Sequence, residues 1–308
     1  MKIHHALEPR SRERPLVLAI GFFDGFHRGH QEIVRALLRL RRPGYRAAVL
    51  SFRNHPATHL RPASVPPLIT TAEERVNLLA GAGIDELYLV PFDAALAGLA
   101  PRRFLEEMLL ERLGVRALVV GSNFRFGAGR AGDAALASEV LREHGAEAHF
   151  VPPLLDGAER ISSTRVRAAI ERGDFAVADR LLCTPYGLRG RVVLGHGRGH
   201  DLGFPTANIE VPAGKLLPKE GVYTAVGRYA GRDYRGLVSI GDNPTFGPGA
   251  KTVEAWLQDF RHTIYGEELA LRDFGFVRDQ RTFDSVGELV TQMQDDATHV
   301  RFPAFNAS

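Results

Sequence analysis

The sequence predicts two domains of different fold class: an α/β domain with a parallel sheet, then a small antiparallel β-barrel that ends in a helix. The chain has 308 residues, which is enough for two domains of ordinary size. In the first part, short apolar runs alternate with helical patterns, as in a parallel sheet covered on both faces. Near Thr184–Pro185 the pattern changes to short strands separated by Gly, Pro and Asn. We therefore expect one domain over residues 1–184 and another over residues 185–308.

Hydrophobic periodicity indicates the elements of the first domain. Short apolar runs predict strands, and apolar residues three and four apart predict helices. Thr71 and Glu74 form a capping box at the start of one helix, and Pro101 stands in the first turn of another. In chain order, the expected strands are Leu16–Ile20, Ala47–Phe52, Glu86–Val90, Ala117–Gly121 and Glu147–Val151, and the expected helices are Gln31–Leu40, Thr71–Leu79, Pro101–Leu113, Ala134–Glu143 and Ser163–Arg172.

The second domain is expected to consist of strands and one closing helix. Ala230–Asp233 indicates a hairpin turn between two of the strands. Ser285 and Glu288 form a capping box before the last helix. The expected strands are Arg191–Leu194, Val222–Tyr229, Tyr234–Ile240, Thr252–Phe260 and Glu268–Phe276, and the apolar face of the helix holds Phe283, Val286, Leu289, Val290, Met293 and Val300.

Composition narrows the class of protein. Apolar residues make up 44% and charged residues 24% of the chain, an ordinary balance for a globular protein. The net charge is only +3, and no block of like charges suggests a nucleic-acid-binding arm. No apolar stretch approaches the roughly 18 residues that a membrane span needs. The single cysteine, Cys183, fits a reducing compartment. We expect a cytoplasmic protein with neither nucleic acid nor membrane as a partner.

The segment Gly21–His30 indicates a first functional site, between a predicted strand and a predicted helix. Its glycines permit a tight turn and the close approach of a ligand. The start of the following helix offers unpaired N–H groups that suit a phosphate. His27 and His30 could donate hydrogen bonds to phosphate oxygens as charge develops in a transition state. Two alternatives stay open: a metal site formed with Asp24, and surface histidines without a function.

A second candidate site lies in the second domain. Thr206 and Asn208 alternate on an extended segment after a glycine-rich loop, so their side chains point to the same side. Hydroxyl and amide oxygens suit Mg²⁺. Glu254 is an acidic residue in a strand-like apolar run, and a carboxylate beside a metal–phosphate site could accept a proton from an attacking hydroxyl. The alternatives are a plain surface loop, a locally bonded turn and an exposed strand glutamate.

These motifs resemble those of two enzymes joined in one chain. Gly21–His30 resembles the HxGH signature of the nucleotidyltransferase superfamily, in the form found in FAD synthetases; Gly121–Gly127 and Arg160–Arg167 resemble two later motifs of that branch. The segments that resemble riboflavin kinases, in the same order, are Leu202–Asn208, Leu217–Tyr223, Ile240–Phe246, Val253–Glu254 and Ile264–Gly266. From about residue 15 to 300, the chain resembles the bacterial bifunctional riboflavin kinase/FAD synthetase family.

The resemblance implies a fold and an activity for each domain. The first would have the Rossmann-like nucleotidyltransferase fold, and the second the barrel of a riboflavin kinase. ATP would phosphorylate riboflavin to FMN, and a second ATP would adenylylate FMN to FAD with release of pyrophosphate. Riboflavin, FMN and ATP are then the substrates and Mg²⁺ is the cofactor, while a transient oligomer stays open.

The resemblance also implies roles for single residues. Glu254 would be the base of the kinase, Thr206 and Asn208 would bind the metal ion, and His27 and His30 would stabilise the transition state of adenylylation. The residues implied in binding nucleotide or phosphate are Gly21, Phe23, Asp24, Gly25, Gly29, Asn123, Arg160, Ser163, Thr164, Arg167, Gly195, Gly197, Gly199 and Gly203. Those implied in binding the flavin are Phe124, Phe126 and Arg278.

Several positions depart from the family pattern. Asn123 stands where many members carry Asp, His200 where Arg is usual, Trp256 where His is usual and Gln280 where Glu is usual; Phe52–Pro56 lacks the proline usual before His-Pro. Two rival interpretations follow: an adenylyltransferase with a degenerate barrel, and a flavin- or RNA-binding regulator without catalysis. Formation of FMN from riboflavin would separate the bifunctional enzyme from the first rival. The intact Glu254, Pro205–Asn208 and HxGH motifs argue against the second, since a binding protein needs no base.

Overall fold

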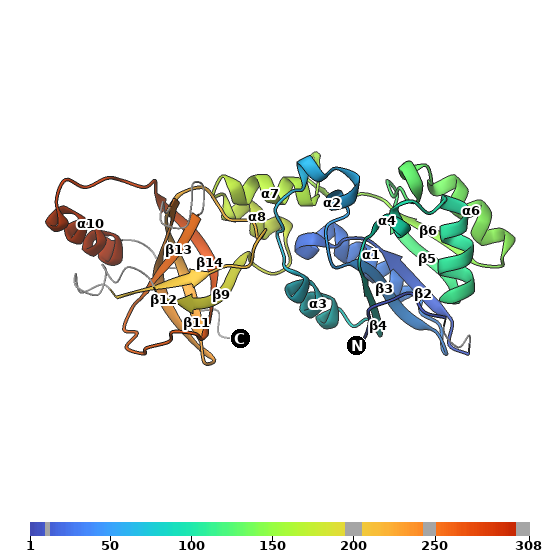
Figure 1. Cartoon of the computed structure of the whole chain (residues 1–308), viewed down its shortest axis with the longest axis horizontal. Coiled ribbons are helices and arrows are strands. Elements are labelled where there is room, and N and C mark those ends of the chain that lie inside the picture. Colours follow the sequence, from blue (N-terminus) through green and yellow to red (C-terminus); the bar gives the residue numbers. More distant parts are fainter. Residues whose placement is uncertain (10–12, 195–204, 243–250, 300–308) are drawn as a thin grey trace. The chain divides into compact units, whose positions relative to one another are not determined.

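The computed structural model describes residues 1–9, 13–194, 205–242 and 251–299 (Figure 1). The chain divides into two compact units, Met1–Ser163 and Thr164–Ser308. The first holds a parallel sheet with its helices, and the second holds a closed barrel. Helices α7 (Ser163–Glu171) and α8 (Phe175–Leu181) thus group almost entirely with the barrel. The domain boundary near residue 184 remains a prediction.

Six parallel strands form the sheet of the first unit, in the order β1-β4-β3-β2-β5-β6. The five predicted strands are confirmed. Strand β1 was not predicted, because three residues are too few to show a period; it pairs with β4, where His4 and Glu86 lie 3.1 Å apart. The bounds are β1 Lys2–His4, β2 Leu16–Ile20, β3 Arg46–Phe52, β4 Glu86–Val90, β5 Val115–Gly121 and β6 Glu147–Val151.

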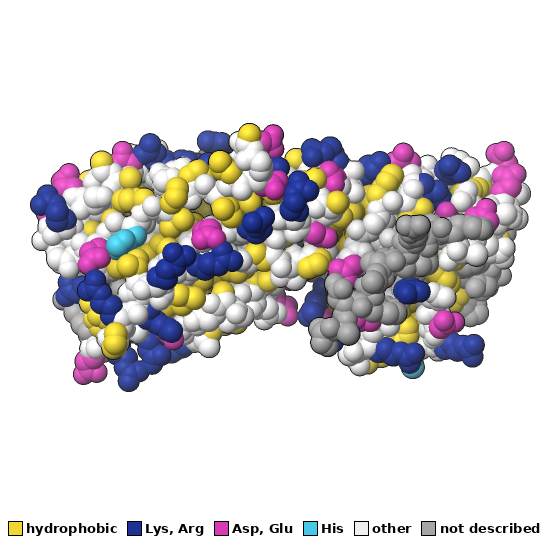
Figure 2. All heavy atoms as spheres, turned by 180° about the vertical axis from the view of Figure 1, so that it is seen from behind, with side chains coloured by type: hydrophobic (Ala, Val, Ile, Leu, Met, Phe, Trp, Pro, Cys, Tyr) yellow, Lys and Arg dark blue, Asp and Glu magenta, His cyan; other side chains and the backbone are white. Residues whose placement is uncertain are grey.

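Charged side chains of both signs cover the surface. On the side shown in Figure 2, basic side chains are scattered with acidic ones among them. Several arginines of the first unit form exposed ion pairs, such as Arg42 with Glu147 at 3.2 Å and Arg103 with Glu107 at 2.5 Å. Among the described residues, no helix has both the length and the apolar character needed to cross a membrane.

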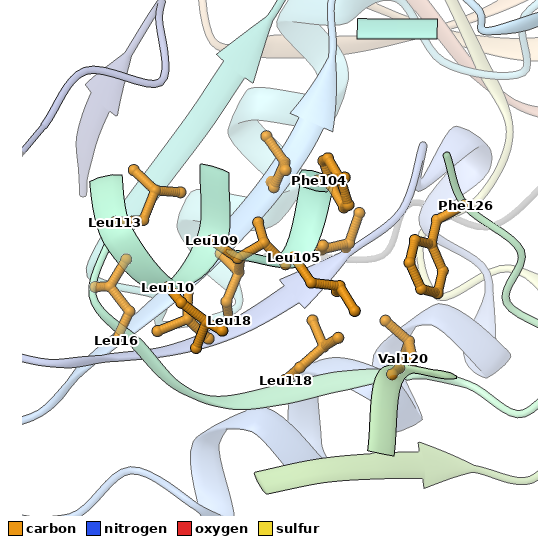
Figure 3. Close-up of a cluster of buried hydrophobic side chains, with 14 of the residues drawn as sticks. Leu16, Leu18, Phe104, Leu105, Leu109, Leu110, Leu113, Leu118, Val120 and Phe126 are labelled. Atoms are coloured by element: carbon orange, nitrogen blue, oxygen red, sulfur yellow. The ribbon is translucent and has the colours of Figure 1, made fainter. Parts of the chain in front are cut away.

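Two apolar layers cover the sheet, one on each face. Alternate residues of β2 point in opposite directions, so Leu16 and Leu18 join a cluster with Leu105 and Leu109 (Figure 3), while Val17 and Ala19 join another with Val34 and Leu37 of α1. Both faces are therefore buried, which explains why the strands appear in the sequence as continuous apolar runs. The parallel α/β class predicted for this domain is confirmed.

The helices and short elements of this unit complete the two layers. The bounds are η1 Asp24–Phe26, α1 Arg28–Arg39, α2 Ala57–Leu60, η2 Pro62–Ser64, α3 Ala72–Gly81, α4 Ala94–Ala97, α5 Pro101–Arg103, η3 Phe104–Arg112, η4 Ala128–Arg130, α6 Ala134–Glu143, and the hairpin β7 Leu155–Asp156 with β8 Glu159–Arg160. The capping box of Thr71 and Glu74 is confirmed.

For one predicted helix, the predicted type of helix is wrong. The sequence predicted a single α-helix over Pro101–Leu113, but only α5 is α-helical, and Phe104–Arg112 (η3) is a π-helix. Leu105, Leu109, Leu110 and Leu113 are all buried on this segment. Intervals of four and five residues suit the wider π-turn as well as the α-helix, so apolar spacing alone could not separate the two.

The strand order of the sheet reverses between β2 and β5, whose carboxyl ends lie side by side. From β2 the chain passes to β3 on one side, whereas β5 pairs with β2 on the other side. In open parallel sheets, ligands bind at such a switch point. Gly21–His30 follows β2 directly and Gly121–Gly127 follows β5. The fold therefore brings two of the sequence motifs to the same edge of the sheet.

The second unit contains a closed antiparallel barrel, as predicted. Its strand order is β10-β13-β12-β11-β14-β9. Ala230 and Gly231 form the predicted hairpin turn, with φ of 47° and 80°. The bounds are β9 Gly187–Val193, β10 Thr206–Glu210, β11 Gly221–Tyr229, β12 Arg232–Asp242, β13 Lys251–Leu257, β14 Glu268–Arg278 and helix α10 Val286–His299. Ser285 Oγ accepts the N–H of Glu288 at 3.3 Å, which confirms the predicted cap of α10.

Candidate active sites

The turn after β2 has a backbone that few sequences tolerate. Phe23, Gly25 and Phe26 have positive φ angles of 56°, 75° and 40°. Glycine adopts this region freely, but phenylalanine does so only when the surroundings hold it there. The tertiary contacts of the turn must therefore supply the stabilisation.

Asp24 supplies that stabilisation through the segment before α3. Its carboxylate, only 1% exposed, accepts the N–H groups of Ile69 (3.1 Å) and Thr70 (2.9 Å) and the Thr70 hydroxyl (3.1 Å). The Thr70 hydroxyl oxygen in turn accepts the N–H of Gly25 at 2.9 Å. Both oxygens of Asp24 thus fix the turn. No local pattern indicated Thr70, because it lies 45 residues along the chain from Gly25.

His27 and His30 lie together at the start of α1. His27 is the N-cap, and its Nδ1 accepts the N–H of His30 at 3.3 Å. The two rings stack with centroids 3.6 Å apart, and the edge of Phe23 contacts His30 at 5.2 Å. A Cβ at Gly29 would stand 3.2 Å from the His27 ring, so glycine permits this packing. Since Nδ1 accepts, the ring proton of His27 stands on Nε2, which can donate to a ligand.

Within the described part of the first unit, the side chains that could together bind a metal ion are not those of the turn after β2. Glu106, Glu143 and His144 lie close enough to share an ion, but Arg102 forms ion pairs with both glutamates, at 3.3 and 2.8 Å. An arginine among carboxylates already neutralises them. The acidic cluster is therefore explained as an ion-pair network between α5, η3 and α6.

A buried arginine contacts Phe22, the residue just before this turn. Arg75 of α3 donates from Nη2 to the carbonyl oxygens of Phe52 (2.8 Å) and Arg53 (3.4 Å). Its guanidinium lies 4.0 Å from the ring centroid of Phe22, whose edge contacts His55 at 4.6 Å. Sequence reasoning missed Arg75, because a charged residue in a predicted helix is normally taken as exposed.

The second motif divides its aromatic residues between core and surface. Phe126 is buried and packs against Phe104 at 6.0 Å (Figure 3), whereas Phe124, stacked on it at 5.3 Å, is half-buried. Asn123 is exposed after β5, and its Oδ1 approaches Gly121 so closely that a Cβ there would stand 3.2 Å away.

The third motif begins beside the first. The Ser163 hydroxyl donates to the carbonyl oxygen of Asp24 at 3.1 Å, so the start of α7 joins the glycine turn. Arg160 is exposed on β8. Thr164 and Arg167 follow along α7 and belong to the second unit.

On the barrel, the strand register brings the predicted kinase residues together. Asn208 of β10 lies directly opposite Glu254 of β13, and Thr206 lies opposite Trp256. Val253, Ala255 and Leu257 are buried in alternation with these half-buried positions, so Glu254 and Trp256 point away from the barrel interior. Thr206, Asn208 and Glu254 therefore share one outer face of the barrel.

A cavity of about 540 Å³ lies next to this row, lined by residues that include Asn208, Lys215 and Lys251. The chain has only four lysines, at positions 2, 215, 219 and 251, and two of them line this cavity. Ammonium groups beside an amide oxygen are suited to a ligand that carries phosphate.

The remaining expected site residues of this unit fall into two sets. Gly195, Gly197, Gly199, Gly203 and His200 lie outside the described residues. Arg278 forms a bidentate ion pair with Asp296 of α10, with Nη2 to Oδ2 at 2.8 Å and Nε to Oδ2 at 3.0 Å. Its guanidinium therefore fastens the closing helix to the barrel.

The two units match separate family models. Residues 10–165 match the FAD synthetase model, and residues 182–302 match the riboflavin kinase model. With the glycine turn at the switch point and the polar row on the barrel, these matches define the class: a transferase with two nucleotide-dependent domains.

Relatives along the full length specify the family. Curated bifunctional riboflavin kinase/FMN adenylyltransferases match from Listeria monocytogenes (34% identical over 289 residues, 92% of this chain and 91% of the relative) and from Bacillus subtilis (32% over 298 residues, 95% and 93%). The crystal structure of a macrolide-efflux protein from Streptococcus pneumoniae matches with a TM-score of 0.85 and 31% identity, over 96% of this chain and 98% of that chain. The chain belongs to the family of bifunctional riboflavin kinase/FMN adenylyltransferases. It is an ATP-dependent enzyme that converts riboflavin to FMN and FMN to FAD.

Proposed function

We propose that the barrel phosphorylates riboflavin with Glu254 as the general base. The observation that carries this assignment is the register that pairs Glu254 with Asn208 on the outer face. Glu254 accepts the proton of the terminal ribityl hydroxyl as its oxygen attacks the γ-phosphorus of ATP. The bond from that phosphorus to the bridging oxygen breaks, and ADP leaves with FMN as the other product.

The metal ion of this step would be Mg²⁺, and the side-chain oxygens of Thr206 and Asn208 would hold it. A hydroxyl and an amide oxygen fit a hard cation, which completes its shell with water and phosphate oxygens. When bound, Mg²⁺ neutralises charge on the phosphates. Lys215 and Lys251 line the adjacent cavity and offer further positive charge to ATP, while Gly195, Gly197, Gly199 and Gly203 let the loop backbone approach the phosphates. Arg278 serves the flavin site by holding the end of β14.

The first unit adenylylates FMN at the turn after β2. A phosphate oxygen of FMN attacks the α-phosphorus of ATP, and the bond to the bridging oxygen of pyrophosphate breaks. His27 and His30 donate to the oxygens that gain charge. The turn residues Gly21, Phe23, Asp24, Gly25 and Gly29 shape the phosphate site, Asn123, Arg160, Ser163, Thr164 and Arg167 bind the nucleotide, and Phe124 contacts the flavin with Phe126 packed behind it.

The setting follows from the same substrates. We place the enzyme in the cytoplasm, where ATP is available and an exposed thiol such as Cys183 stays reduced. Riboflavin, FMN and ATP are its partners, without nucleic acid or membrane, and a transient oligomer remains open.

Substitution of Glu254 tests the kinase assignment. Glu254→Gln should slow FMN formation from riboflavin by roughly 10²–10⁴-fold, because the amide cannot accept the proton. The control is adenylylation of supplied FMN by the same sample, which should be unchanged. FMN formation at the wild-type rate would remove Glu254 from the role of base.

Substitution of the histidines tests the adenylyltransferase assignment. His27→Ala and His30→Ala should each lower kcat for FAD formation by about 10²–10³-fold, with little change in ATP affinity, since both donors act on developing charge. FMN production from riboflavin serves as the control. Loss of a tightly bound transition metal, measured by metal analysis, would favour the metal-site alternative instead.

A further inference from the structure

The polar row on the outer face of the barrel extends beyond Asn208 and Glu254. Ser239 of β12 lies directly opposite Glu254 on the side away from Asn208. Opposed residues in antiparallel strands have Cβ atoms about 4.5–5.5 Å apart and point to the same face. The Ser239 hydroxyl is therefore a neighbour of the Glu254 carboxylate.

Gln280, just after β14, determines the direction of the hydrogen bond at Ser239. Its Nε2 donates to Ser239 Oγ at 2.9 Å and to the carbonyl oxygen of Ile240 at 3.2 Å. A carbonyl oxygen only accepts, so the contact with Ile240 fixes which end of the amide faces β12. An amide nitrogen only donates, so Ser239 Oγ must be the acceptor in its bond with Gln280.

The proton of Ser239 must then point away from Gln280. A hydroxyl has one proton and two lone pairs, and Gln280 occupies one of the lone pairs. The side chain that faces Ser239 across the strands on this surface is Glu254. Hydrogen bonds to catalytic groups are often long without substrate and shorten in the complex.

We propose that Ser239 is a positioning residue for the kinase: in the substrate complex it donates its proton to one oxygen of Glu254, and Gln280 fixes that direction. The other oxygen of Glu254 is thereby aimed at the ribityl hydroxyl. This inference rests on the proposed role of Glu254 as base.

Removal of the Ser239 hydroxyl is the first test. Ser239→Ala should lower kcat for FMN formation by about 10–100-fold, the effect of one hydrogen bond to a charged group. KM for riboflavin and for ATP should change by less than about threefold, because Ser239 contacts the base and not the substrates. Ser239→Thr keeps the hydroxyl and should retain most of the rate.

A substitution at position 280 tests the role of Gln280. Gln280→Met has a similar length but cannot donate to Ser239 Oγ, so the hydroxyl is no longer held toward Glu254 and kcat should fall, though by less than in Ser239→Ala. The double variant Ser239→Ala/Gln280→Met should be no slower than Ser239→Ala alone, since Gln280 acts only through this hydroxyl.

Three results would overturn the inference: wild-type kcat in Ser239→Ala, a greater loss in Gln280→Met than in Ser239→Ala, or additive loss in the double variant. Adenylylation of supplied FMN and thermal unfolding of each variant control for folding. If Glu254→Gln itself kept its rate, the base assignment would fail first. A slow Glu254→Gln beside a normal Ser239→Ala would overturn only the role of Ser239.

Discussion

Arg75 is a buried charge whose contacts explain its presence. The side chain is only 1% exposed, and within the described part of the chain its Nε and Nη1 have no hydrogen-bond partner. Burial lowers the pKa of Arg75 to about 10, so the group still carries its charge at neutral pH. The side chain of Arg75 links three segments: α3, the Phe22 ring and the end of β3. Such an under-satisfied group, beside the glycine turn after β2, indicates a positioning role.

Replacement of Arg75 should therefore affect both stability and one activity. Arg75→Met removes the donor to the Phe52 carbonyl, and we expect a loss of about 1–3 kcal/mol in the free energy of unfolding of the first unit. Displacement of Phe22 should lower the adenylylation rate by about 10–100-fold. Denaturant unfolding and FAD formation from FMN are the measurements.

Arg75→Lys separates charge from shape in the same experiment. It keeps a cation but loses the planar contact with Phe22 and part of the donor geometry, so its values should fall between those of the wild type and Arg75→Met. FMN formation from riboflavin should stay constant in both. A methionine variant with unaltered unfolding and rate would show that the buried charge does not hold the turn.

At this scale, the sequence predicted the candidate site residues better than the residues that support them. His27 and His30 stand in one short motif, as do Thr206 and Asn208, so local spacing placed each pair on one turn or one strand face, whereas Glu254 lies opposite Asn208 only through the register of β13 with β10. Thr70, just before α3, and Arg75, within it, contact the turn and its flank from far along the chain. Such partners are set by tertiary packing, which leaves no periodic trace in a single sequence.

Helix α8 contributes side chains to the apolar core of the barrel unit. The Phe175 ring lies 5.7 Å from Tyr186, 5.8 Å from Tyr223 and 5.4 Å from Phe274. Asp179 accepts the N–H of Tyr186 at 3.0 Å. The apolar core of this unit thus includes residues that precede the boundary predicted near residue 184.

Two fragments should differ in stability for this reason. A fragment of residues 164–308 should have a free energy of unfolding about 3 kcal/mol or more above that of a fragment of residues 186–308, the usual effect of removing a buried phenylalanine. It should therefore unfold at a higher denaturant concentration. Both keep Thr206, Asn208 and Glu254 and should form FMN from riboflavin. Equal unfolding midpoints would mean that α8 adds nothing to the core of the barrel.

The elements that were predicted well are those with a strong period. Buried strands such as Leu16–Ile20 and the amphipathic helix Ala134–Glu143 are confirmed to the residue. The π-helix at Phe104–Arg112 was not predicted, because hydrophobic spacing hardly separates turns of different width. Strand β1 needs its partner β4 to exist at all, so no local signal could reveal it.

For the whole molecule, the assignment of each reaction to its own unit has a consequence for the intermediate. If each unit reacts with substrates from solution, FMN made by one chain can be adenylylated by another. A mixture of Glu254→Gln and His27→Ala chains should therefore convert riboflavin to FAD, although each variant alone does so slowly. Product separation by chromatography over time measures this directly.

The opposite result is equally informative. If the mixture makes no more FAD than the two separate samples together, FMN must pass between the sites of one chain. With exchange through solution, by contrast, free FMN in the wild-type reaction should rise before FAD appears and FAD formation should show a lag, which provides an independent check.

The barrel and the parallel sheet also differ in whether they have unpaired strand edges. Closure of the barrel leaves no unpaired strand edge, whereas the parallel sheet has two, at β1 and β6. Open edges can pair with other chains and start aggregation. Here one edge is a strand of only three residues, and the other carries Glu147 and His149, bonded to each other at 3.0 Å, with Arg42 also paired to Glu147. A short strand and a row of charges discourage edge-to-edge association, so the open sheet that brings two sequence motifs to one edge is also protected from joining its own copies into fibres.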